Sequence, residues 1–81
     1  MRKKSVSRET LEQIQLRKVG REFRIKRQDM NLKLLDVEKT SGVSSFTISK
    51  LERGQLSNCS LETLNKIATA LKVKLYINVI V

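Results

Sequence analysis

The sequence predicts a small, mostly α-helical domain that ends in a single β-strand. Up to residue 71, apolar residues recur at the three- and four-residue intervals of amphipathic helices. In the middle of the chain, Gly42 and Ser44 separate two short segments of this kind, which predicts a tight turn between two helices. In the last ten residues the period changes to two, as in a strand. We therefore expect one domain of four to five helices in residues 7–71 and a strand in residues 72–81.

The first part of the chain predicts a basic arm followed by a long helix. Residues 1–6 (MRKKSV) have the composition of a disordered basic arm. Ser7 is a suitable N-cap for a helix that is expected to end at about Gln28. The apolar stripe of this helix consists of Leu11, Ile14, Val19, Phe23 and Met30. Gly20 interrupts the pattern, which predicts either a kink or a close contact with another element.

Two short helices joined by a tight turn are predicted next. They should run from about Leu32 to Ser41 and from about Ser45 to Glu52. Gly42 tolerates the left-handed backbone of a sharp turn, Ser44 can cap the second helix, and Gly54 can end it. The residues whose offsets bring the two helices together at a fixed angle are Val37, Ser41, Val43, Ile48 and Leu51.

A further helix is predicted after a loop at residues 55–59. Ser60 is a good N-cap for a helix from Leu61 to Leu71. The apolar stripe that should pack this helix on the others consists of Leu61, Leu64, Ile67, Ala68 and Leu71.

The last ten residues have the pattern of a strand. Apolar, mostly β-branched residues stand at every second position from Val73 to Val81. The rest of the chain predicts no second strand, and a lone strand would leave backbone N–H and C=O groups unpaired. We therefore expect the same strand of a second copy to pair with it across a two-fold axis. The alternatives are a frayed tail or a continuation of the preceding helix.

The charge of the chain points to a polyanionic partner. The net charge is +9 with a pI near 10.2, which suits nucleic acid or an acidic membrane surface. Residues 1–27 hold ten Lys and Arg against three acids, a net of +7. Residues 28–59 hold four basic and four acidic residues, and residues 60–81 hold three basic residues and one acidic residue. The excess positive charge therefore lies in the N-terminal arm and first helix.

Composition argues against an enzyme, a metal site and a cofactor. The chain has no histidine, and one cysteine without histidine cannot assemble a zinc site. Three separate glycines cannot form a phosphate-binding loop. No apolar run is long enough to span a membrane, and no signal peptide is predicted. The single Cys59 is expected to be a reduced thiol, which favours a cytoplasmic protein.

The central segment is similar to a known family of DNA-binding domains. Residues 31–54, NLKLLDVEKTSGVSSFTISKLERG, resemble the Xre/Cro-type helix-turn-helix of phage repressors and bacterial regulators. Residues 19–32, VGREFRIKRQDMNL, and residues 60–71, SLETLNKIATAL, resemble the first and fourth helices of that family. The resemblance implies a lambda-repressor-like bundle. Glu38 stands where the family usually has a small residue, so we expect it to bend outward or widen the packing, and Leu34 replaces a frequent glutamine.

The pattern at the C-terminus resembles that of one smaller group within this family. A helix-turn-helix core that ends in a strand is similar to HipB-type antitoxins, whose terminal strands pair in a dimer that represses its own operon. This similarity implies a bacterial or phage protein with a HipA-type kinase toxin as a partner. The strand residues that it assigns to the dimer are Val73, Leu75, Tyr76, Ile77 and Val79. Residues 55–71 also resemble controller proteins of restriction-modification systems, so a controller or a phage-type regulator is an alternative.

The resemblance assigns base contacts to the N-terminal half of the recognition helix. The residues at those positions are Ser44, Ser45, Phe46, Ser49 and Lys50. A lysine can donate to guanine O6 and N7, a serine discriminates weakly, and a phenylalanine ring can contact a thymine methyl group. For Phe46 the alternative is a place in the hydrophobic core. A different class of function for the whole chain is a protein-interaction module that binds no DNA.

Other positions are expected to contact phosphates or to hold the fold. The phosphate-contacting residues that we predict are Lys33, Thr47, Arg53 and Asn58. Ordinary surface charge is the alternative for Lys33 and Arg53, and a bond to the backbone of its own helix is the alternative for Thr47. The basic arm either follows the DNA backbone or is a solvated terminus. Arg27 and Glu52 match family positions that form a structural ion pair.

Overall fold

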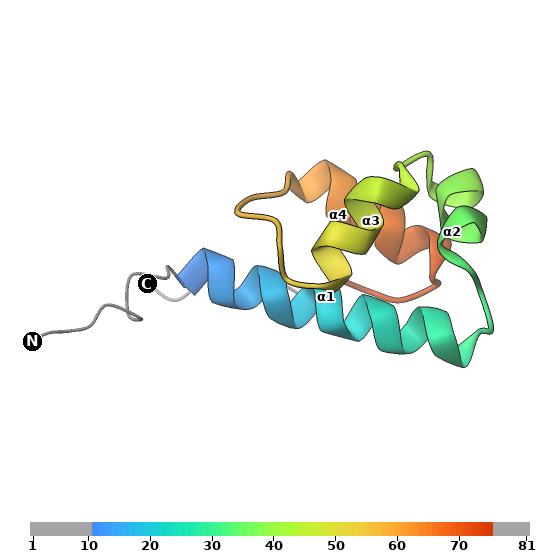
Figure 1. Ribbon diagram of the computed structural model, residues 1–81, viewed down its shortest axis with the longest axis horizontal. Coiled ribbons are helices and arrows are strands. Elements are labelled where there is room, and N and C mark those ends of the chain that lie inside the picture. The colour runs from blue at the N-terminus through green and yellow to red at the C-terminus, as the bar shows by residue number, and fades with distance from the viewer. Residues whose placement is uncertain (1–10, 76–81) are drawn as a thin grey trace, which may run out of the picture.

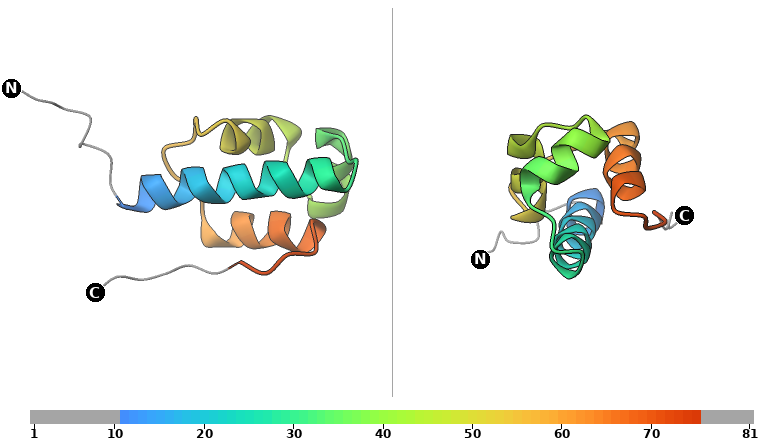
Figure 2. Two further views of the ribbon diagram at one scale, coloured as in Figure 1. Left: turned by 90° about the horizontal axis from the view of Figure 1, so that it is seen from below. Right: turned by 90° about the vertical axis from the view of Figure 1, so that its right-hand side faces the viewer.

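The computed structural model describes residues 11–75, so Ser7, the basic arm and the segment from Tyr76 onward lie outside the described residues. Within that range the chain forms helices α1 (Leu11–Asp29), α2 (Leu34–Ser41), α3 (Ser45–Glu52) and α4 (Leu61–Ala70), and no strand (Figure 1). The two views of Figure 2 show α1 between α3 on one side and α4 on the other. The predicted helical bundle is confirmed over this range.

The turn between α2 and α3 has the predicted conformation. Gly42 lies in the left-handed region with a φ of 79°, and its N–H donates to the carbonyl of Glu38 at 2.8 Å. The Ser41 hydroxyl accepts from the Val43 N–H at 3.0 Å, and this bond across Gly42 stabilises the turn. The Ser44 hydroxyl then accepts from the Thr47 N–H at 3.1 Å and caps α3.

Helix α2 begins two residues later than predicted, at Leu34 rather than Leu32. Asn31 has a positive φ of 57°, which interrupts a helical path through this segment. The Asp36 carboxylate accepts from the Lys33 backbone N–H at 2.7 Å, so the new helix starts after Lys33. At the other end of the chain, α4 ends at Ala70 and Leu71 becomes its C-cap.

The core lies among all four helices, where α1 contacts α3 and α2 contacts both α3 and α4. Predicted core residues from every helix are buried: Phe23, Val37, Val43, Ile48, Leu51, Leu64, Ile67, Ala68 and Leu71. Leu16 and Ala70 are buried as well, although the sequence patterns did not include them. Leu61 was wrongly predicted to be core and is 56% exposed. It starts α4 beside two open hollows of the surface, and no other element of residues 11–75 covers it.

Gly20 makes a close contact with α3, one of the two alternatives that the sequence allowed. A Cβ atom at this position would lie 2.1 Å from the carbonyl oxygen of Leu51, which is far inside van der Waals contact. Helix α1 runs without a break through Gly20. The absence of a side chain therefore lets α1 pack directly on the last turn of α3.

The strand that was predicted to begin at Val73 is not formed over residues 73–75. Val73 and Leu75 are half-buried against the core, and the Val73 N–H donates to the carbonyl of Ala68 at 3.0 Å. A strand needs a partner for its backbone groups, and the described part of this chain offers none. The strand residues Tyr76, Ile77 and Val79 lie outside the described residues, so pairing between two copies remains a prediction.

Candidate nucleic-acid interface

Helix α3 is held in one orientation by its inward residues and its N-terminal cap. Ile48 and Leu51 are each 1% exposed and fill the core beneath the helix. At the N-terminus, Ser44 and Thr47 bond to each other twice, since the Ser44 hydroxyl also donates to Thr47 Oγ1 at 3.0 Å. The opposite side of α3 is therefore presented to solvent in a fixed register.

The outward side of α3 carries an exposed aromatic ring and a lysine. Phe46 is 70% exposed, so the alternative of a place in the hydrophobic core is excluded. The Lys50 ammonium lies 5.2 Å from the centroid of the Phe46 ring, within reach of a cation–π interaction. Ser44 is exposed, and Ser45, Ser49 and Lys50 are half-buried. The five predicted base-reading residues thus occupy the N-terminal cap and outer side of one short helix.

Glu38 connects α2 to the start of α3 and does not bend outward, which was one of the two alternatives that the sequence allowed. Its Oε1 atom accepts from the Ser45 backbone N–H at 2.6 Å. Hydrogen bonding to the Ser45 backbone holds the pKa of the Glu38 carboxyl below its ordinary value. The longer side chain reaches across the turn to an N–H group that the start of a helix leaves without a partner in the helix. The glutamate thereby anchors α3, and the Ser45 N–H is already bonded within the protein.

The predicted ion pair joins α1 to the end of α3. Arg27 Nε donates to Glu52 Oε2 at 2.7 Å, and a second guanidinium nitrogen donates to Oε1 at 2.9 Å. The third guanidinium nitrogen donates to the carbonyl of Leu32 at 2.8 Å, in the connection between α1 and α2. The two side chains are 14% and 5% exposed, and the bond to Glu52 raises the pKa of Arg27. One arginine therefore fixes three segments around α3.

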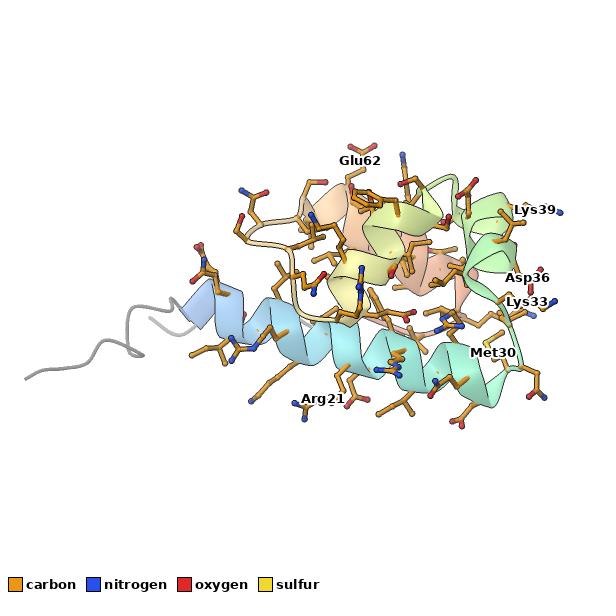
Figure 3. The ribbon with its side chains drawn as sticks, in the orientation of Figure 1. Arg21, Met30, Lys33, Asp36, Lys39 and Glu62 are labelled. Carbon is orange, nitrogen blue, oxygen red and sulfur yellow. The ribbon has the colours of Figure 1, made fainter. Side chains whose placement is uncertain are left out.

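The predicted phosphate-contacting residues lie on two sides of α3. Lys33 is exposed at the N-cap of α2 (Figure 3), and Arg53 and Asn58 are exposed after the end of α3. Figure 1 shows α3 between the start of α2 and the loop that precedes α4. Arg53 Nε donates to the carbonyl of Ser49 at 3.4 Å. Thr47 is half-buried, and its hydroxyl accepts from the Ser44 hydroxyl rather than bonding to the backbone of its own helix.

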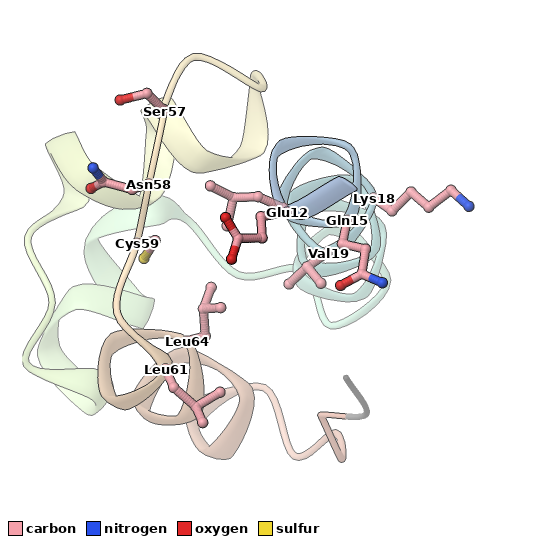
Figure 4. Close-up of a pocket in the computed structure, with 10 residues that line it drawn as sticks. Glu12, Gln15, Lys18, Val19, Ser57, Asn58, Cys59, Leu61 and Leu64 are labelled. Carbon is pink, nitrogen blue, oxygen red and sulfur yellow. The ribbon is translucent and has the colours of Figure 1, made fainter. Parts of the chain in front are cut away.

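A cavity of about 500 Å³ lies between α1, residues 57–59 and α4 (Figure 4). Leu16, Val19 and Leu64 form part of its wall, and Asn58 stands at its edge. Cys59 also lines it, and partial burial raises the pKa of that thiol. In residues 11–75 no three His, Cys, Asp or Glu side chains gather as they would around a metal ion. None of the helices in that range is long and apolar enough to span a membrane.

Helix α1 has a set of arginines to which the sequence patterns assigned no role. Arg17, Arg21 and Arg24 are exposed and recur at intervals of four and three residues. That spacing places them along one side of the helix, and it was the signal in the sequence that could have identified them.

Comparison with known proteins identifies one family. The Cro/C1-type HTH DNA-binding domain matches residues 22–75, which include α2, α3, α4 and the second half of α1. Neither the curated proteins nor the solved structures gave a significant match.

Proposed function

This chain belongs to the Cro/C1-type helix-turn-helix DNA-binding domain family, and we propose that it is a dimeric, sequence-specific transcriptional repressor. The observation that carries this proposal is the outward side of α3. Phe46 stands exposed, with the half-buried Lys50 beside its ring, on a helix that Ile48, Leu51, Ser44 and Glu38 hold in a single register. Such a helix fits the major groove of DNA with its N-terminal residues toward the base edges.

Base contacts and phosphate contacts have separate roles in this proposal. Lys50 would donate to guanine, and the Phe46 ring would contact a thymine methyl group. Lys33, Arg53 and Asn58 would set the position of α3 through contacts with the backbone on the two sides of the groove. Phosphate neutralisation supplies affinity that falls with salt, whereas base contacts supply the preference for one sequence.

Dimerisation through residues 73–79 is the second part of the proposal. The alternation of apolar residues in this segment supports it, together with the absence of a partner strand in residues 11–75. Two recognition helices related by a two-fold axis would face half-sites about one helical turn, ~34 Å, apart. The target would then be an inverted repeat close to the promoter of the chain's own gene.

The resemblance to HipB-type proteins extends the proposal to an autoregulating antitoxin. Its partner would be a HipA-type kinase toxin, bound through surfaces away from residues 44–50 because those must remain free for DNA. Toxin binding would then change the affinity for DNA by the same factor by which DNA binding changes the affinity for the toxin. Co-purification with the product of the neighbouring gene, followed by a shift assay, tests this part. A neighbouring methyltransferase or phage genes would instead support a controller or phage-type regulator.

Footprinting and sedimentation test the core of the proposal. Footprinting on DNA from upstream of the gene should show protection of an inverted repeat. Sedimentation should show a dimer that becomes a monomer when residues 73–81 are removed. A single asymmetric site, or a truncated chain that remains dimeric at micromolar concentration, would reject the two-fold arrangement. Binding to random DNA with equal affinity would favour another class of function, such as a protein-interaction module.

A further inference from the structure

Helix α1 extends beyond the family domain at its N-terminal end. The helix begins at Leu11 and the family match begins at residue 22, so eleven residues of α1 precede the match. This extension is packed on the rest of the protein, because Leu16 is buried in the common core and Val19 is half-buried against it. The residues in it are therefore held in position relative to α3.

Three contacts show which side of α1 adjoins the last turn of α3. The side chain of Arg17 lies against Gly54, Gly20 meets the Leu51 carbonyl, and Arg27 binds Glu52. These positions are separated by three and seven residues, so they lie on the same side of the helix. Arg24, four residues after Gly20, lies on that side as well.

Arg21 lies at the edge of this side of α1. In Figure 3 its side chain projects from α1 away from the other helices. Arg21 and Arg24 are both exposed, and neither makes an ion pair or a hydrogen bond within residues 11–75. The acids of the helix, Glu12, Glu22 and Asp29, fall on other sides of it by helical spacing.

The chemistry of this side suits phosphate groups. It carries arginine at positions 17, 21 and 24, while the lysines of α1 stand elsewhere. A guanidinium group can bind a phosphate through two parallel hydrogen bonds, which an ammonium group cannot do. Residues 28–59, which include α2 and α3, carry four basic and four acidic side chains. The recognition segment therefore needs positive charge from a neighbouring element to bind a polyanion firmly.

We propose that the arginine side of α1, formed by Arg17, Arg21 and Arg24, is an additional binding site for the DNA backbone. This inference rests on the proposed function, because it places the site beside an α3 that is seated in the major groove. The arginines contact phosphates next to those held by Arg53, at the C-terminal end of α3. Arg17 and Arg21 precede the family match and Arg24 lies within it, so the first two extend the contacted stretch of backbone beyond the matched domain.

The test is the salt dependence of DNA binding by the full chain with Arg21→Ala and Arg24→Ala together. The matched control is Lys39→Ala with Lys66→Ala, which removes the same charge from exposed positions on α2 and α4. Loss of two phosphate contacts should lower the slope of log affinity against log salt by about two, on operator and random DNA alike. Hydroxyl-radical footprinting should lose protection at the backbone beside the half-site. Arginine-to-lysine changes at both positions should retain most of the slope.

The outcomes separate this inference from the proposed function. A slope and a footprint equal to those of the control variant would overturn the arginine site, while operator binding by the unaltered chain would leave the repressor proposal standing. An unaltered chain that binds no DNA would overturn both. Equal thermal melting of both variants shows that the comparison concerns binding and not folding.

Discussion

Helix α3 and helix α1 differ in charge and in the way their outward side chains are held. The segment that contains α3 is electrically balanced, and its outer side is placed by a cap, a carboxylate and a buried underside. Residues 1–27, which include most of α1, carry a net charge of +7, and Arg21 and Arg24 project freely from the helix. The comparison teaches that the firmly placed outward side chains and the excess positive charge reside in different helices, so base reading and backbone binding would depend on different elements under the proposed function. The contacts between the two helices therefore decide whether both can act at once.

The largest effect should come from breaking the ion pair between the two helices. Arg27→Ala leaves the Glu52 carboxylate, 5% exposed, without its bidentate partner, and also removes the bond to the Leu32 carbonyl. We expect a loss of about 3 kcal/mol in the free energy of unfolding, because an uncompensated buried charge is costly. Chemical denaturation measures it. The control is Lys66→Ala, which removes an exposed pair with Glu62 at 3.7 Å and should cost less than about 0.5 kcal/mol.

A smaller loss should follow from forcing the two helices apart. Gly20→Ala places a methyl group against the Leu51 carbonyl, and backbone atoms on both sides must shift. We expect a loss of about 2 kcal/mol, typical of an overpacked contact. Gly42→Ala is a useful comparison, because no atom lies within 4 Å of the added carbon and only the left-handed φ opposes it. That variant should lose about 1 kcal/mol. An unchanged melting curve for Gly20→Ala would mean that α1 does not press on α3.

The smallest effect concerns the anchor of α3 and depends on pH. The pKa of Glu38 is lowered in the folded chain by its bond to the Ser45 backbone. A lowered pKa means that the ionised carboxylate stabilises the fold at pH values above its ordinary pKa. This contribution is lost as pH falls through the lowered folded value. Glu38→Gln should therefore reduce stability at neutral pH and converge with the unaltered chain in acid. Parallel curves for the two proteins across that range would contradict the anchor.

Local signals in the sequence predicted much of this fold. The bounds of α3, the left-handed Gly42 and the caps at Ser44 and Ser60 were predicted because each depends on residues close in the chain. The exposure of Leu61 was not, since helical spacing gives the side of a helix but not which elements cover it. The contact between Glu38 and Ser45 was also missed, because it depends on how the turn brings two helix ends together.

The candidate site shows the same limit. The resemblance placed five residues at the cap and on the outer side of α3, and it placed Arg27 opposite Glu52. It did not decide whether Phe46 belongs to the core or to the surface, because the apolar pattern of an eight-residue helix is too short to distinguish the two. The arginine side of α1 carried a spacing signal, but its position beside α3 required the contacts at Gly20 and Gly54.

The central claim is that α3 reads bases while neighbouring charges bind the backbone. The most direct measurement is the affinity of Lys50→Ala and Arg53→Ala for the operator and for random DNA over a range of salt. Lys50→Ala should lose roughly 1–3 kcal/mol on the operator, with relaxed preference at one base pair and little change on random DNA. Arg53→Ala should weaken both DNAs alike and lower the salt slope by about one. Equal weakening of operator and random DNA by Lys50→Ala would contradict the claim.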